Sequence, residues 1–131
     1  MSMKIHILGI CGTLMGSIAL LARQLGHQVT GTDENVYPPM STQLESAGIK
    51  LSTGYTAECI PAGTELVIVG NANLPRGNAA LETVMNRGIA YTSGAEWLGR
   101  YLLADRWVIA VAGTHGKTTT TSMISWILEY A

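Results

Sequence analysis

The chain has 131 residues and a mass of 13.9 kDa, with 47% hydrophobic and 13% charged residues, which fits one compact soluble-type domain. Eight Lys and Arg against nine Asp and Glu give a formal net charge of −1, which argues against a nucleic-acid-binding protein because phosphate neutralisation requires a basic excess. Cys11 and Cys59 are too few and too far apart for a disulfide framework or a metal clip, and no apolar run reaches the roughly 18 to 20 residues of a membrane span. We therefore expect free thiols, a cytoplasmic location and no membrane partner.

Short apolar runs rich in β-branched residues predict the strands of a parallel sheet, because their hydrophobicity is continuous, as in strands buried on both faces. In chain order these runs lie at residues 4–8, 28–31, 49–52, 65–69, 89–91 and 107–112. Leucines and alanines at three- and four-residue spacing predict helices at residues 15–25, 40–47, 78–87, 95–103 and 117–129. The alternation predicts an α/β fold: a Rossmann-like, doubly wound parallel sheet with helices on both faces.

Phenylalanine is absent from the chain, so the tryptophans are expected to fill the core in its place. These are Trp97, Trp107 and Trp126. His6 lies inside the first predicted strand and His27 precedes the second, and both are expected to have packing or surface roles rather than catalytic ones.

The first strand is followed by the glycine-rich loop at residues 9–16, GICGTLMG. Such a turn into a helix directs backbone amides and the helix dipole at a diphosphate. Relative to the dinucleotide fingerprint GxGxxG, Cys11 and Leu14 replace two glycines, so a turn without a ligand is an open alternative. Asp33 follows Gly12 by 21 residues and ends the second strand, where an acidic group binds a ribose hydroxyl, or else caps a turn.

A second loop, VAGTHGKTT at residues 111–119, lies between a predicted buried strand and a helix. Gly113 and Gly116 allow the backbone amides to curl around phosphate oxygens, Lys117 places a cation on them, and Thr118 offers a hydroxyl to Mg²⁺. The loop departs from GxxxxGK[ST] because Val111 stands at the first glycine position. It nevertheless predicts an ATP phosphate site.

The loop AGTHGKTT at residues 112–119 resembles the ATP loop of the Mur ligases, which are ATP-dependent amide-bond ligases of bacterial cell-wall synthesis. Together with HILGICGTLM at 6–15, it is most similar to members whose acceptor is UDP-N-acetylmuramate. The segments at 35–41, 70–72, 76–78 and 93–98 look like the branch that recycles a murein tripeptide, and the runner-up is the branch that adds L-alanine.

The resemblance implies two sets of site residues. The expected ATP-binding residues, of which Lys117 is catalytic and Thr118 a Mg²⁺ ligand, are Gly113, Thr114, His115, Gly116, Lys117, Thr118 and Thr119. The expected UDP-sugar-binding residues are Gly9, Cys11, Gly12, Thr13, Met15, Asp33, Asn35, Tyr55 and Asn71.

The resemblance also implies two domains. Residues 1–104 would form the UDP-substrate domain, and 105–131 would form the first strand, loop and helix of a truncated central ATP-binding domain. The partners implied are UDP-N-acetylmuramate and a murein tripeptide.

Family members are far longer than this chain, so we expect an N-terminal part that is inactive alone. The strand at 107–112 would then add to the first sheet as a sixth strand, in a monomer, rather than pair with another chain.

An alternative function of a different class is a non-catalytic Rossmann module that binds NAD. Cys11 and Leu14 argue against it, because they replace two glycines of the dinucleotide fingerprint.

Overall fold

Five parallel strands form the sheet of the computed structural model, which describes residues 1–70, 74 and 77–131. The strands are β1 (Lys4–Leu8), β2 (Gln28–Asp33), β3 (Lys50–Thr53), β4 (Leu66–Val69) and β5 (Ala90–Ser93). Their order is β3-β2-β1-β4-β5, with Ile5 paired to Val29 on one side and to Leu66 on the other. The parallel sheet predicted from the apolar runs is confirmed.

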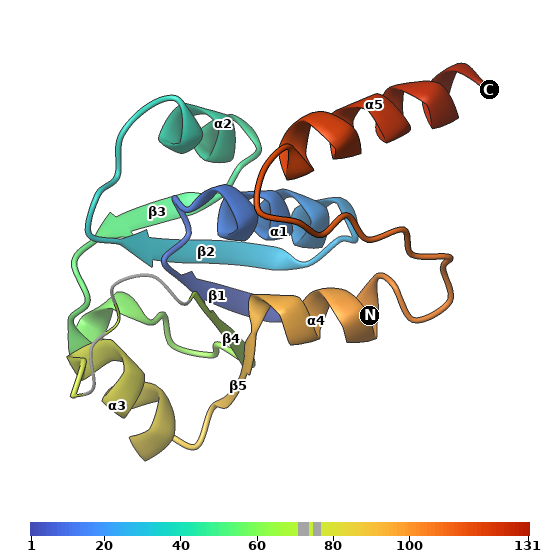
Figure 1. Ribbon diagram of the computed structural model, residues 1–131. Helices are drawn as coiled ribbons and strands as arrows, with labels where there is room; N and C mark the ends of the chain where they lie inside the picture. Colours follow the sequence, from blue (N-terminus) through green and yellow to red (C-terminus); the bar gives the residue numbers. More distant parts are fainter. Residues whose placement is uncertain (71–73, 75–76) are drawn as a thin grey trace.

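Helices cover both faces of this sheet (Figure 1). One face carries α1 (Thr13–Gln24), α2 (Met40–Ser46) and α4 (Gly94–Tyr101), which share a core cluster that contains Ile7, Ile18, Leu44 and Trp97. The other face carries the short 3₁₀ helix η1 (Ala57–Cys59) and α3 (Ala79–Asn86), around a cluster of Leu8, Ile60, Val67, Ala80 and Val84. The doubly wound architecture is therefore confirmed.

The chain reverses its direction of winding between β1 and β4. From β1 it moves outward through β2 to β3, and it then returns to β4 on the opposite side of β1. In such sheets the connections on the two sides diverge at the carboxyl ends of the central strands, and a crevice opens there. The fold thus places the loops after β1 and β4 at one crevice.

The C-terminal segment differs from the prediction. Residues 107–112 form no strand and are not part of the sheet, and Trp107 is 101% exposed. The edge strand β5 offers them no position covered on both faces, because its own Ala90 and Tyr91 are exposed. The prediction of a sixth strand is therefore wrong for this chain.

Helix α5 (Lys117–Tyr130) begins at the predicted residue but has no buried side chain, and Figure 1 shows it extending away from the sheet. Trp97 is in the core as expected, whereas Trp107 and Trp126 are exposed, which corrects the expectation that all three fill it. Within the described ranges, no helix combines the length and hydropathy needed to cross a bilayer.

Candidate nucleotide-sugar site and phosphate loop

A pocket of about 440 Å³ lies at the carboxyl ends of the strands, and all five strand ends contribute to it. Eight residues predicted to bind the UDP-sugar line it: Gly9, Cys11, Gly12, Thr13, Met15, Asp33, Asn35 and Tyr55. The ninth, Asn71, lies outside the described residues. Residues far apart in the sequence are thus brought to one crevice.

The turn after β1 is fixed by its own backbone hydrogen bonds. The N–H groups of Gly9 and Ile10 both donate to the Thr32 carbonyl, with N···O distances of 2.8 and 3.3 Å, and the Gly12 N–H donates to the Gly9 carbonyl at 3.2 Å. Gly9 has φ +81°, a left-handed conformation that side chains disfavour. These amides are therefore engaged in the turn and are not free for a ligand.

Free amides begin at the N-terminus of α1. Its capping residue, Gly12, has no side chain to accept a hydrogen bond, and the first intrahelical bond runs from the Gly16 N–H to the Gly12 carbonyl at 2.8 Å. The N–H groups of Thr13, Leu14 and Met15 have no acceptor among the residues described. Three donors and the positive end of the helix dipole thus border the pocket, an arrangement suited to an anion.

Asp33 connects the loops after β1 and β2. Its Oδ2 accepts the Cys11 N–H at 2.9 Å and its Oδ1 accepts the Asn35 N–H at 3.1 Å. Each carboxylate oxygen retains a second lone pair, so Asp33 can hold the turn and also accept a hydroxyl from a ligand. This geometry is compatible with both roles predicted for Asp33, as a cap of the turn and as an acceptor for a ribose hydroxyl.

Two titratable side chains of the pocket, Tyr55 and Cys11, have raised pKa values. Burial, followed by the charges of Asp33 and Glu34, raises the pKa of Tyr55 to about 12, so its hydroxyl keeps its proton and can donate. Burial and then the Asp33 charge raise the pKa of the Cys11 thiol. Cys11 is thus a neutral lining group and a poor nucleophile.

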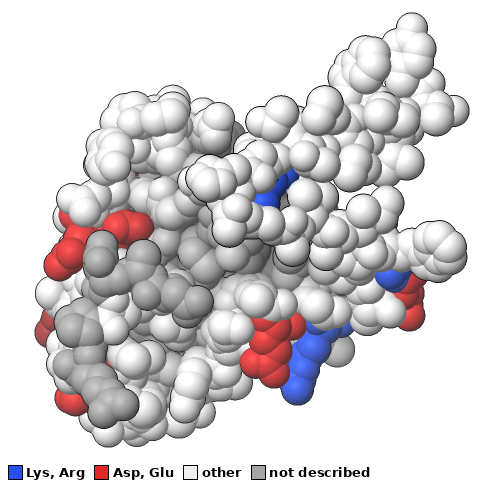
Figure 2. All heavy atoms as spheres, in the orientation of Figure 1, with Lys and Arg blue, Asp and Glu red and all other residues white. Residues whose placement is uncertain are grey.

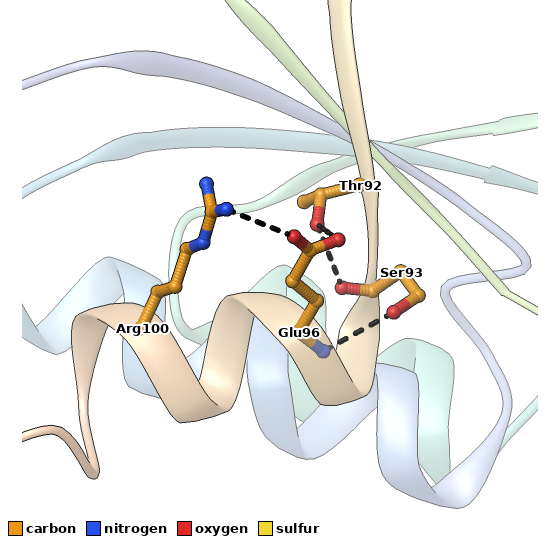
Figure 3. A network of polar contacts seen from close by, with 4 residues as sticks. All are labelled: Thr92, Ser93, Glu96 and Arg100. Carbon is orange, nitrogen blue, oxygen red and sulfur yellow. Dashed lines mark hydrogen bonds and ion pairs between the residues drawn. The ribbon is translucent and has the colours of Figure 1, made fainter.

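Residues 93–95, at the end of β5 and the start of α4, also line the pocket and were not predicted as site residues. Their position is fixed by the network in Figure 3: the Ser93 hydroxyl accepts the Glu96 N–H at 3.1 Å, and the Thr92 hydroxyl donates to Glu96 Oε2 at 2.9 Å. An ion pair of 3.3 Å joins Glu96 to Arg100. The sequence signal for this helix start is the S-x-x-E pattern at 93–96.

Other lining residues missed from the sequence are Leu14, Glu34, Tyr37, Val69 and Gly70. Leu14 and Glu34 directly follow a residue predicted for the site, Val69 ends a predicted strand, and Tyr37 and Gly70 lie within two residues of a predicted site residue. Acidic side chains gather at the left edge of the face in Figure 2, and lysine and arginine form no patch on that face. Among the described lining residues the charged ones, Asp33 and Glu34, are both acidic.

The predicted ATP loop lies apart from this pocket, because none of residues 113–119 lines it. Gly116 caps α5 with φ +77°, and the first intrahelical bond runs from the Thr120 N–H to the Gly116 carbonyl at 3.0 Å. The Lys117 ammonium folds back and donates to the Gly113 carbonyl at 2.8 Å. His115 contacts the neighbouring Thr114 hydroxyl at 3.2 Å.

The N–H groups of Lys117, Thr118 and Thr119 have no acceptor in the described part of the chain, so the loop presents free amides beside a cation. This donor set fits the phosphates of a nucleotide. Thr118 and Thr119 also border an apolar hollow on α5, with Met123, Trp126 and Ile127. No group of three His, Cys, Asp or Glu side chains within residues 1–70, 74 and 77–131 could hold a metal ion.

The sheet order and the crevice at the carboxyl ends of the strands together define a Rossmann-like α/β protein. The profile described as "Mur ligase family, catalytic domain" matches residues 4–106, and the chain belongs to the Mur ligase family. It is 61% identical over 127 residues to UDP-N-acetylmuramate–L-alanyl-γ-D-glutamyl-meso-2,6-diaminoheptandioate ligase of Escherichia coli, a match that covers 97% of this chain and 28% of that protein.

A UDP-N-acetylmuramate–L-alanine ligase of Rubrobacter xylanophilus is 42% identical over 127 residues, which are 97% of this chain and 28% of that protein. Among solved structures, a murein peptide ligase of Psychrobacter arcticus superimposes with a TM-score of 0.93 at 58% identity, over 98% of this chain and 26% of that one. The chain thus spans little more than a quarter of the length of the relatives that it matches.

Proposed function

We propose that this chain is the N-terminal part of an ATP-dependent ligase that joins the tripeptide L-alanyl-γ-D-glutamyl-meso-diaminopimelate to UDP-N-acetylmuramate in cell-wall recycling. The observation that carries the proposal is the 440 Å³ pocket, in which the free amides of α1 and the Asp33 carboxylate border one crevice. A nucleoside diphosphate has the anionic and hydroxyl groups that such a pair of features would bind.

The UDP-sugar would lie with its diphosphate on the amides of residues 13–15 and a ribose hydroxyl on Asp33. Gly9, Cys11 and Gly12 would shape the turn, while Asn35 and Tyr55 would face the nucleotide or the sugar, and Asn71 is included by resemblance. The protonated Tyr55 hydroxyl would donate to an oxygen of the ligand. The two carboxylates of the pocket disfavour a second anionic group near the ribose end.

ATP would bind on residues 113–119, with its phosphates on the free amides at the start of α5 and on Lys117. Thr118 would supply one hydroxyl ligand to Mg²⁺, whose carboxylate ligands would come from other residues, since none gather near Thr118 in the described part of the chain. When bound, ATP supplies the phosphoryl group that activates the muramoyl carboxylate for attack by the amine of the tripeptide.

Lys117 is proposed as the catalytic residue because charge accumulates on the phosphoryl oxygens during transfer and a fixed cation stabilises it. In the present conformation the lysine donates to Gly113, and it would exchange this acceptor for a phosphate oxygen. His115 and Thr114 would line the same loop. The 131 residues alone are expected to be inactive, because the metal site is incomplete without further acidic ligands.

We further propose that residues 1–104 form the UDP-substrate domain and that 105–131 begin the ATP-binding domain, in a cytoplasmic enzyme without nucleic-acid or membrane partners. The exposed apolar side chains of 107–109 and α5 support this boundary, since they suit a surface covered by further protein. A monomer is favoured over a dimer.

Calorimetric titration of the chain with UDP-N-acetylmuramate and with NAD tests the substrate assignment. Binding of the nucleotide sugar but not of NAD supports the proposal, and the reverse preference would favour a non-catalytic dinucleotide module. In a protein carrying the full length of the relatives, phosphate release that depends on the tripeptide, and is weaker with L-alanine, would establish the amine substrate.

A further inference from the structure

A buried polar cluster lies within the sheet, below the pocket and outside it. His6 of β1 is 1% exposed and Thr32 of β2 is fully buried. His6 Nδ1 lies 2.7 Å from the Thr30 hydroxyl and Nε2 lies 2.9 Å from the Thr32 hydroxyl. The Thr32 hydroxyl is also 2.8 Å from that of Ser52 in β3, so the cluster connects three adjacent strands.

The contacts of this cluster allow a consistent set of hydrogen-bond directions, which we assign from the Ser52 hydroxyl. The Ser52 hydroxyl donates to the Gly31 carbonyl at 3.4 Å, so it accepts from Thr32. Thr32 has then used its proton and accepts from His6 Nε2, which leaves Nδ1 to accept from Thr30. With these directions His6 is the neutral Nε2–H tautomer, and burial, which lowers its pKa to about 4, keeps it neutral near pH 7.

Thr32 also anchors the turn at residues 9–11 that borders the pocket. Its carbonyl accepts the N–H groups of both Gly9 and Ile10, and the next residue, Asp33, accepts the Cys11 N–H. A shift of the β2 backbone at Thr32 would therefore move every one of these acceptors relative to α1. The Thr32 hydroxyl, held between His6 and Ser52, restrains that backbone.

We propose that His6 is a positioning residue for nucleotide-sugar binding: by donating from Nε2 to the Thr32 hydroxyl, it fixes the end of β2 that carries the acceptors of the turn at residues 9–11. This inference rests on the proposed function of the pocket. His6 touches no ligand and takes no part in proton transfer. Its contribution is to hold the free amides of α1 and the Asp33 carboxylate at the spacing that the ligand requires.

Two substitutions separate the bonds of His6. In His6→Gln the side-chain amide reaches the place of Nε2 and keeps the donor to Thr32, whereas in His6→Asn it reaches only the place of Nδ1 and keeps the bond to Thr30. We expect His6→Asn to weaken binding of UDP-N-acetylmuramate roughly three- to tenfold, the effect of one hydrogen bond, and His6→Gln to stay within about twofold of the original chain. Calorimetry of the chain measures both.

Amide hydrogen exchange provides a readout that needs no ligand. In His6→Asn the Gly9 and Ile10 amides should exchange faster than in the original chain, and in His6→Gln they should not. Val84→Ala, which opens a core position on the same sheet face, serves as the control for general loss of stability and should leave the affinity unchanged. If His6→Asn does not fold, Thr32→Val removes the hydroxyl that contacts both His6 and Ser52 and should produce the same two changes, whereas Ser52→Ala, which removes only the Ser52 contact, should not.

Equal affinity and equal exchange in His6→Asn and the original chain would overturn the inference, as would a His6→Gln variant as impaired as His6→Asn. A ¹⁵N spectrum that shows a proton on Nδ1 instead of Nε2 would also overturn it. If the original chain does not bind UDP-N-acetylmuramate but the exchange pattern is as expected, the proposed function fails while the positioning of the turn stands.

Discussion

The chain contains two helix starts of the same local design in different surroundings. Helices α1 and α5 are both capped by a glycine without a side-chain hydrogen bond, and both present three backbone amides that have no acceptor in the described part of the chain. The start of α1 is enclosed by five strand ends and tied to Asp33. The start of α5 lies on an exposed segment without a buried side chain.

A phosphate-type loop therefore supplies hydrogen-bond donors, but the surrounding fold decides whether they form a binding site. Around α1 the sheet supplies a rigid frame, a pocket and a second polar group. At the start of α5 the Lys117 ammonium donates to a carbonyl of its own loop, and the neighbouring hollow is apolar. The site at the start of α1 should therefore bind its ligand with residues of this chain, whereas the loop at the start of α5 should require additional protein to bind its ligand.

The largest expected effect concerns stability. Trp97→Ala should lower the free energy of unfolding by roughly 3–5 kcal/mol, because the side chain is 1% exposed in the core. Trp107→Ala should change it by less than about 0.5 kcal/mol, because Trp107 is fully exposed. Urea denaturation followed by far-UV circular dichroism compares the two, and similar losses would mean that residues 105–131 pack on the sheet.

The next effect concerns catalysis in a protein with the full length of the relatives. Lys117→Ala should lower the rate of ATP-dependent ligation roughly 100- to 1,000-fold, the usual loss on removal of a group that stabilises the transferring charge. Its affinity for UDP-N-acetylmuramate should not change, because Lys117 does not line the pocket. Lys50→Ala, on the exposed side of β3, is the matched control, and ligation retained in Lys117→Ala would make the loop structural.

A smaller effect concerns pH. The pKa of His6 is lowered to about 4 from 6.5, so between these values the unfolded chain takes up a proton that the folded chain does not. Stability from this group is complete above pH 6.5 and is lost as the pH falls, by roughly 2 kcal/mol between pH 7 and 5. His6→Gln should lose this part of the pH dependence in urea titrations, and an unchanged slope would contradict the buried neutral state.

The smallest effect that we predict concerns the pocket itself. Gly12 has an ordinary extended conformation, with φ −65° and ψ 149°, and an added Cβ would lie 3.4 Å from the Gly9 carbonyl. Gly12→Leu should therefore fold but weaken nucleotide-sugar binding at least about tenfold, because the side chain would cover the amides of α1. Gly99→Leu, at an open position of α4 outside the pocket, is the control. Unchanged affinity in a folded Gly12→Leu variant would remove the turn from the site.

The sequence predicts the central strands β1 and β4 well because they are buried. The run at 4–8 ends where β1 ends, just before Gly9, and Asp33 ends β2 as expected. The run at 107–112 has the same composition, yet it is exposed and irregular. Local composition cannot tell whether a partner strand is present, because that depends on the rest of the fold.

The site was predictable where its residues follow a strand directly, and less so elsewhere. Gly9, Gly12 and Asp33 belong to a spaced pattern, and the pocket contains all three. Residues 93–95 have no such spacing relative to them, and only the sheet order brings them together. His6 was expected to be a packing or surface residue, and it is buried. Its bonds to the hydroxyls of Thr30 and Thr32 depend on the register between β1 and β2, which the composition does not reveal.

Calorimetric titration of the 131-residue chain with UDP-N-acetylmuramate tests the central claim most directly. We predict one site per chain, the same affinity after Lys117→Ala, and binding at least about tenfold weaker in Gly12→Leu, because no residue of the phosphate loop lines the pocket at the strand ends. Absence of binding by the folded chain, or binding that disappears with Lys117 rather than with Gly12, would contradict it.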